Sequence, residues 1–526
     1  MKRVKFGKKK NAQAKKKQLV TQDDYYEEAV LNEEQAERWL LSDIKKSLRF
    51  YLIAYNLYEV GLTTQEERTE SCTYNICYNQ TRLLLQIHTD YLANNGYINI
   101  LRYINLEDIP DIEKILLELP DIISRLENVL SSFSEDNITW DLKFNLLTSY
   151  LSMVESSDLT RESVNLIDLC NRFIDLSQNL ISSQINELKS WDSSSEGQDS
   201  NISTFQRDTL DSDNSVDRTR GTGILTGNNN EGDSSEMMEV SDQVTTDSLS
   251  ELLTNCYKFS QSVMEFCIEN VNSNDATINE VQNNYLVDLI TKFLLYLDDV
   301  LSSILVEEKI EIKHEDLDIV RFAIEGLKII TVTNRPDELV TYINSASIEG
   351  IELNLSKIDL LEFAINQIDD EQKDVQWGLA TLLNRILNDT RSRLSLSRNE
   401  CIKTNSDLLS RMVFQLCDVT ITSSDNELRR FAIRKRENSD ANTEVLNILM
   451  KNAVTLVTNA MNIAEKSCGL QETIVDKLKR NYIFNQARLR SQLLQEITLK
   501  GQISISLDSE TNVDQLKDHS FYKLFL

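Results

Sequence analysis

The feature that most constrains this chain is its shortage of residues that break helices. Its 526 residues include only three prolines and 13 glycines. A strand-rich fold needs frequent turns, and turns draw on these two residue types. Apolar side chains recur at helical spacing, as in Leu48, Tyr51, Leu52 and Tyr55. Because 41% of the residues are hydrophobic, the chain can bury a core, and we predict an all-α fold, an α-solenoid of helical hairpins.

The helical pattern divides the chain into five segments. Residues 25–190 and 248–500 carry it, and we expect them to form one array. Between them, residues 191–247 are rich in Ser, Asp, Asn, Thr and Gly and are too polar to offset chain entropy, which predicts a long disordered acidic loop. The basic tail 1–24 is predicted to be disordered for the same reason, and residues 501–526 form a separate C-terminal tail.

Two prolines indicate where helices begin. Pro110 precedes Asp111, and Pro120 precedes Asp121. Proline in the first turn of a helix sacrifices no hydrogen bond, and an acidic residue there interacts favourably with the helix dipole. Each pair therefore predicts the start of a new helix.

A charged stretch at residues 421–441 interrupts the apolar pattern, and we predict that it breaks the helices there. It contains Arg429-Arg430 and Arg434-Lys435-Arg436. Two interpretations are equally open, a second nuclear import signal or a helix face exposed to solvent.

Charge is distributed very unevenly along the chain, whose formal net charge is −29. Nine basic residues and no acid lie in the first seventeen positions: Lys2, Arg3, Lys5, Lys8, Lys9, Lys10, Lys15, Lys16 and Lys17. Without them, 46 basic residues face 84 acids, a net charge of −38. Such a tail is typical of a nuclear localisation signal read by an import receptor, the alternative being a solubilising or RNA-contacting tail. The anionic body repels nucleic acid and favours a basic protein partner.

No recognisable reaction centre occurs in the sequence. The eight cysteines are scattered without a CxxC pair, and only three histidines are present. Phosphate-binding loops, nucleophile elbows and HExxH motifs are absent from the sequence. We therefore expect a non-enzymatic protein without cofactor or metal. Scattered thiols and the lack of a long apolar run predict a protein of the nucleus and cytoplasm that does not cross a membrane.

Residues 36–57 carry a pattern of large and small residues that suits two closely packed helices. An aromatic residue precedes a turn, and small, aromatic and small residues follow at helical spacing. The residues in question are Trp39, then Ser42-Asp43 at the turn, then Ser47, Tyr51 and Ala54. This pattern resembles the tetratricopeptide (TPR) repeat, and the resemblance extends over residues 36–90.

A second hint of repetition joins the two ends of the chain. Residues 75–83 read NICYNQTRL and residues 481–489 read NYIFNQARL, with five identical positions. The resemblance to TPR proteins therefore extends weakly to residues 442–498, while HEAT or armadillo repeats remain open for the C-terminal half. In some TPR proteins, lysines and asparagines clamp a terminal carboxylate. Here Asn79 matches one asparagine, but Glu33 or Glu34 stands where lysine is expected, which argues against such a clamp.

Two functions follow from this reading. The first is a helical-repeat scaffold whose acidic concave surface holds a basic client, such as a ribosomal protein or a histone, as a nuclear escort or assembly chaperone. In architecture this resembles fungal helical-repeat escort proteins. The alternative is a structural adaptor subunit of a larger multiprotein complex, in which the charge serves only solubility.

Overall fold

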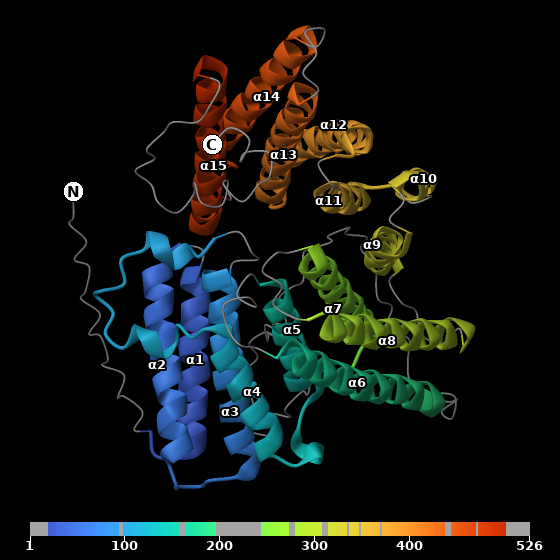
Figure 1. Ribbon diagram of the computed structural model, residues 1–526. Coiled ribbons are helices and arrows are strands. Elements are labelled where there is room, and N and C mark those ends of the chain that lie inside the picture. The colour runs from blue at the N-terminus through green and yellow to red at the C-terminus, as the bar shows by residue number, and fades with distance from the viewer. Residues whose placement is uncertain are drawn as a thin grey trace, which may run out of the picture. The chain divides into compact units, whose positions relative to one another are not determined.

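The computed structural model consists of helices throughout the residues that it describes (Figure 1), which confirms the all-α prediction. Residues 1–18 of the predicted basic tail 1–24, most of the predicted loop at 191–247 and the C-terminal tail 501–526 lie outside the described residues. The described residues are 19–40, 42–93, 98–156, 165–195, 244–272, 279–307, 314–333, 336–346, 349–368, 371–436, 443–469 and 472–500.

The chain divides into two compact units between Ile138 and Thr139. The domain boundaries expected at residues 190 and 247 stay a prediction. The first unit contains four α-helices joined by short 3₁₀ and π turns. They are α1 (Gln22–Leu40), α2 (Ile44–Thr63), α3 (Glu70–Ile87) and α4 (Leu119–Ser132), with η1 (His88–Ala93), η3 (Ile100–Tyr103), η4 (Ile112–Lys114) and η5 (Glu135–Asn137).

The second unit contains the remaining helices of the described chain, and most of them pack against neighbours in sequence. They are α5 (Trp140–Glu155), α6 (Leu166–Ser195), α7 (Thr246–Asn272), α8 (Glu280–Glu307), α9 (His314–Thr333), α10 (Pro336–Ser345), α11 (Ile351–Gln367), α12 (Lys373–Thr404), α13 (Leu409–Lys435), α14 (Thr443–Ala464) and α15 (Ile474–Lys500). From α11 to α15 each helix packs on the next (Figure 1). This succession is the arrangement expected of stacked helical hairpins.

The tight packing of α1 on α2 rests on small residues. Ala29 and Ala36 lie one heptad apart on α1, and Ser47 and Ala54 lie one heptad apart on α2, all fully buried. Gly61 continues the α2 series, and a Cβ atom there would lie 3.0 Å from Ile76 Cδ1. Small side chains allow the two helix axes to approach closely.

Helix α1 begins at Gln22, inside the segment 1–24 that the sequence predicts to be disordered. The reason is a reciprocal cap: Asp24 N donates to Thr21 Oγ1, and Thr21 N donates to Asp24 Oδ2, each at 3.1 Å. A Thr-x-x-acid pair of this kind satisfies backbone donors that the first helical turn leaves free. Gln22 is itself fully buried and donates to the carbonyl oxygen of Gly61.

The two prolines behave differently. Pro120 lies in the first turn of α4, as predicted. Pro110 is followed only by the short 3₁₀ turn η4, because Asp111 adopts a left-handed conformation with φ of 61°, which an α-helix cannot include.

The helix break predicted at 421–441 is wrong for residues 421–435, because α13 continues to Lys435; residues 437–441 of that stretch lie outside the described residues. Its charged residues are buried rather than solvated: Asp425, Glu427 and Arg429 are at most 7% exposed. Two polar neighbours donate hydrogen bonds to adjacent helices. Ser424 Oγ donates to the carbonyl oxygen of Ala453 at 2.9 Å, and Asn426 Nδ2 donates to that of Ala380 at 2.9 Å. These bonds allow a polar helix segment to remain helical inside the protein.

Two apolar clusters organise the second unit. In one, Leu327, Leu361, Leu383 and Leu387, from α9, α11 and α12, are fully buried, and Ile268 of α7 joins the same cluster. In the other, Phe173 of α6 stacks on Phe259 of α7 with ring centroids 3.6 Å apart, and Phe293 of α8 meets Phe173 edge-on. Helices α6 and α7 thus contact each other directly across the residues that separate them in sequence.

We expect Ala54→Leu to destabilise the first unit by roughly 1–3 kcal/mol, because no space exists for extra methyl groups between α1 and α2. Urea unfolding followed by circular dichroism measures the effect. Ile53→Leu is the matched control, since Ile53 is 46% exposed, and its effect should stay within about 0.5 kcal/mol. Equal stability of both variants would contradict the close approach of these helices.

Candidate protein-binding surface

Five acidic side chains of the second unit are linked pairwise by electrostatic repulsion, and we call them the acidic row. They come from three helices: Glu155 from α5, Glu265 and Glu269 from α7, and Asp359 and Glu362 from α11. Glu265 interacts with Glu155 and Glu269, and Asp359 interacts with Glu265 and Glu362. The row therefore runs from α5 over α7 to α11 without interruption.

The carboxylates of the row are difficult to ionise. Desolvation by the surrounding protein is the main cause that raises the pKa of Asp359 to about 7, and the charges of Glu362 and Glu265 add to it. The pKa of Glu265 is raised mainly by desolvation too, although Gln261 donates a 2.9 Å hydrogen bond to its carboxylate. Asp359 is nevertheless solvent-exposed.

Cations are scarce around the row. Lys258 of α7 lowers the pKa of Glu155, which burial raises. Among the residues described, neither an ion pair nor a side-chain hydrogen bond is formed by Glu155, Glu269 or Asp359. The row is thus a set of carboxylates that repel one another and that a partner's cations could neutralise.

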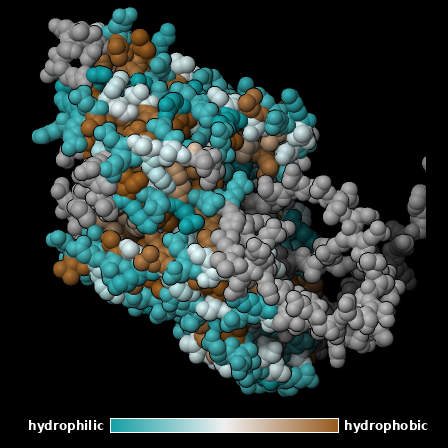
Figure 2. Space-filling model, turned by 90° about the vertical axis from the view of Figure 1, so that its right-hand side faces the viewer, coloured by the Kyte–Doolittle hydropathy of each residue, from teal (hydrophilic) through white to brown (hydrophobic). Residues whose placement is uncertain are grey.

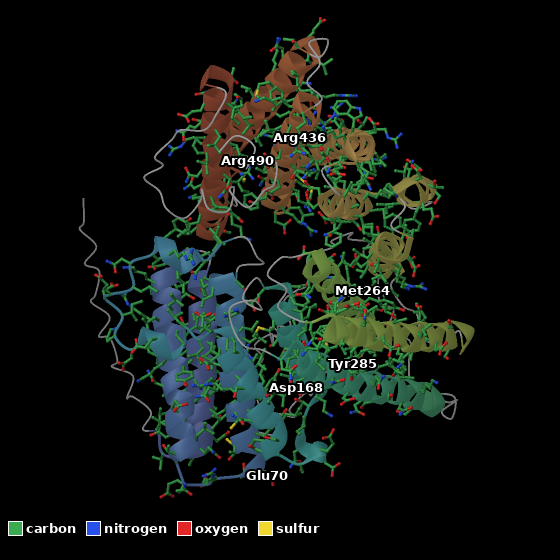
Figure 3. The ribbon with its side chains drawn as sticks, viewed as in Figure 1. Glu70, Asp168, Met264, Tyr285, Arg436 and Arg490 are labelled. Carbon is green, nitrogen blue, oxygen red and sulfur yellow. The ribbon has the colours of Figure 1, made fainter. Side chains whose placement is uncertain are left out.

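Glu362, the last residue of the acidic row, also belongs to a series of oppositely charged side chains that extends into the interior. Glu362 faces Arg429 of α13, with Oε1 and Nη2 3.7 Å apart. One turn earlier on α13, Asp425 accepts hydrogen bonds from Nε of Arg490 at 3.1 and 3.0 Å. Arg490, labelled on α15 in Figure 3, also donates to Gln486 Oε1 at 3.0 Å. Acid and base alternate from α11 to α15, so each buried charge has an opposite neighbour.

The arginines of residues 421–441 could be a second import signal or a solvated helix face by sequence alone. In the structure they contact other side chains of the protein. Arg430 pairs with Glu427 at 2.8 Å, and only 15% of its side chain is exposed. Trp377 of α12 lies beneath the guanidinium groups of Arg430 and Arg434, 4.7 and 4.0 Å from its ring centroid. Arg429 is buried. Neither of the two interpretations therefore describes Arg429 and Arg430.

The residues singled out for repeat packing lie in the first unit. Ser47, Tyr51 and Ala54 are fully buried. Trp39 is only partly buried at the end of α1, and Lys46 Nζ lies 3.3 Å from its ring centroid. Asp43 caps α2 by accepting a 3.0 Å hydrogen bond from Lys46 N, so the chain turns where the pattern indicates.

The residues considered for a carboxylate clamp are occupied internally. Glu33 is buried, accepts a 2.6 Å hydrogen bond from Tyr58 and forms an ion pair with Arg82. Asn79 donates to the Tyr26 hydroxyl and to the carbonyl oxygen of Asn75. These side chains link α1, α2 and α3.

Metal-binding and membrane-spanning features were sought in the described part of the chain. That part contains no cluster of three or more His, Cys, Asp or Glu side chains arranged to hold a metal ion. None of its helices is long and apolar enough to span a bilayer. In Figure 2, the visible face mixes hydrophilic and hydrophobic residues without one large apolar patch.

The acidic row should cost the fold stability, and Asp359→Asn should recover part of it. The pKa of Asp359 is about 7 in the folded protein against an ordinary 3.8. Folding then takes up a proton between these values, so this residue's contribution to stability falls as the pH rises from about 4 to 7. Asp359→Asn should thus stabilise the protein at pH 8 by less than about 1 kcal/mol, since solvent screens an exposed carboxylate.

Thermal unfolding at pH 8 and pH 4 measures this effect, and the gain should vanish at pH 4. Asp108→Asn is the opposite control, because the hydrogen bond from Lys45 lowers the pKa of Asp108. It should bring no gain at pH 8. A loss of stability in Asp359→Asn at pH 8 would contradict the desolvated state of this carboxylate.

Comparison with known proteins identifies the relatives of this chain. The protein YNL193W of Saccharomyces cerevisiae is 42% identical over 550 residues, with 98% of each chain covered. Residues 157–332 match the YNL193W-like protein middle domain, and residues 343–526 match the YNL193W C-terminal domain.

Two solved structures of Nro1, described as a nuclear import adaptor, also align. One is 10% identical with a TM-score of 0.28 and covers 84% of this chain and 89% of its own. The other, from S. pombe, is 11% identical with a TM-score of 0.26 and covers 88% and 99%. These TM-scores are too low to support a functional argument, whereas the yeast relative matches end to end. The chain belongs to the YNL193W protein family.

Proposed function

We propose that this protein is a non-enzymatic helical scaffold that holds a basic protein segment on its acidic row. The observation that carries the proposal is the row itself, in which Glu155, Glu269 and Asp359 have neither an ion pair nor a side-chain hydrogen bond within the described chain. A client that supplies lysine and arginine side chains would neutralise the row and relieve its repulsion. In this way the scaffold would escort a protein whose basic surface otherwise binds nucleic acid, such as a ribosomal protein or a histone.

The location of this activity would be the nucleus and the cytoplasm. The nine basic residues between Lys2 and Lys17 support import through a receptor. The resemblance of residues 36–90 to TPR repeats supports a role in protein binding for the first unit, because packed helical hairpins of that kind present a continuous surface.

A structural adaptor subunit is the second candidate, and α8 favours it. Val281 and Leu295 of this helix are 79% and 61% exposed, and Tyr285 is 46% exposed. Apolar side chains exposed to this degree on one helix suit contact with another helical protein. Such contacts should resist salt, whereas binding through the row should weaken as salt rises.

We expect loss of the row's charges to weaken binding of a basic peptide. The variant Glu155→Gln, Glu265→Gln, Glu269→Gln, Asp359→Asn should bind a fluorescent arginine-rich peptide about tenfold or more weakly, because each exposed ion pair contributes up to about 1 kcal/mol. Fluorescence anisotropy at low salt measures the affinity.

The matched control removes four exposed acids from the first unit: Glu66→Gln, Glu67→Gln, Glu113→Gln, Asp136→Asn. It makes the same change in net charge and should leave the affinity within about twofold. If both variants weakened peptide binding equally, net charge alone would explain the effect, and the proposal would be wrong.

Replacing the nine basic residues of the tail by glutamine should abolish nuclear accumulation of a fluorescent fusion of the full chain. The physical reason is that import receptors read clustered cations. Microscopy of living cells gives the ratio of nuclear to cytoplasmic signal. Unchanged nuclear accumulation would show that the tail is not a nuclear localisation signal.

A further inference from the structure

The described part of the chain leaves one face of α8 exposed. This helix packs on α7 and, to a lesser extent, on α6. The side chains on its inward face are at most 2% exposed: Leu286, Ile290, Phe293 and Leu297. The outward face nevertheless carries the exposed apolar side chains of Val281, Tyr285 and Leu295, of which Tyr285 is labelled in Figure 3. Helix α8 is therefore apolar on a side that its own protein does not cover.

The outward residues form a single stripe, which we call the α8 stripe. It consists of Val281, Tyr285, Asp288, Lys292, Leu295 and Asp299, all of them exposed. Their spacings alternate between four and three residues, the spacing of residues that line the seam between two paired helices. In the middle of the stripe, Lys292 Nζ lies 2.6 Å from Asp288 Oδ2, and these side chains are 70% and 60% exposed.

The α8 stripe is complementary to itself when a second copy runs in the opposite direction. A two-fold axis beside Ile290 sets each residue opposite the one that lies equally far on the other side of position 290. Tyr285 then faces Leu295 of the second copy, and Asp288 faces Lys292 of the second copy. Because the axis repeats every contact, the pairing contains two apolar contacts and two contacts between opposite charges.

The two charges exclude the neighbouring ways of pairing the stripe with itself. An axis beside position 288 would set Asp288 against its own copy, and an axis beside position 292 would do the same for Lys292. Parallel pairing in register would bring both residues next to their own copies. Like charges in contact oppose association, so only the antiparallel arrangement about Ile290 matches charge with opposite charge and apolar with apolar side chains.

We propose that the α8 stripe is a self-association surface on which a second copy of this chain docks antiparallel, with the two-fold axis beside Ile290. The proposal goes beyond the proposed function and does not depend on the acidic row. The stripe extends over about 27 Å, and one helix from each copy makes a contact smaller than the standard interface of about 1,600 Å². We therefore expect a weak dimer, with a dissociation constant on the order of 10 µM.

Exchange of charges tests the arrangement directly. Sedimentation velocity of the full chain in about 0.15 M salt measures dimerisation under conditions that screen the net negative charge. Lys292→Asp and Asp288→Lys should each weaken the dimer about tenfold or more, because like charges then face each other twice. An equimolar mixture of the two variants should dimerise within about threefold of the wild type, because the acids of one variant face the lysines of the other.

An apolar variant supplies a second, independent measurement. Leu295→Glu should weaken the dimer about tenfold or more, since Leu295 contacts Tyr285 of the second copy. Leu396→Glu on α12 is the matched control, because the two leucines are 61% and 65% exposed and the change in net charge is the same. The control should stay within about twofold of the wild type.

Several results would overturn the proposal. They are a wild type that remains monomeric up to about 200 µM, a dimer that neither charge variant weakens, and a mixture of the variants that does not recover. A stronger dimer of Asp288→Lys alone would show that net charge governs association. A monomeric wild type that still binds the arginine-rich peptide would leave the proposed function intact. Circular dichroism checks folding, and Leu295→Glu still decides the question if a charge variant does not fold.

Discussion

The ion pair between Asp425 and Arg490 is the interaction on which the C-terminal helices depend. It lets a charged stretch of α13 lie between α12, α14 and α15, where a lone carboxylate would cost several kcal/mol. Glu427 and Arg429 are buried in the same stretch and have partners of their own. The helix continues because every charge that enters the interior meets an opposite one. Polar pairs of this kind also fix how neighbouring helices align along their axes.

In the acidic row, by contrast, neighbouring charges have the same sign. Its carboxylates are close enough to raise one another's pKa, and among the described residues Glu155, Glu269 and Asp359 form no ion pair, although the charge of Lys258 acts on Glu155. Such an arrangement lowers stability, because each carboxylate disfavours the charged form of its neighbour. The charge-balanced interior and the unbalanced row meet at Glu362, which belongs to the row and pairs with the buried Arg429.

The sequence predicts the helical class well, because scarce proline and glycine leave few alternatives. The prediction fails where local signals mislead: at residues 421–435 the charge indicates a break but the helix continues, and at Pro110 a left-handed Asp111 prevents an α-helix. An acidic surface could be expected from net charge alone. Its members could not, since Glu155 and Asp359 are two hundred residues apart and only tertiary packing unites them.

The stacking of Phe173 on Phe259 has a consequence for the evolution of this family. Because α6 and α7 are joined by their own side chains, the fold does not rely on the chain between residues 195 and 246 to keep them together. Lengthening such a connection costs little, since each doubling adds only about 0.6 kcal/mol of closure entropy. Relatives can therefore gain or lose sequence at this point, and acquire new modification or sorting signals there, without redesigning the helical body.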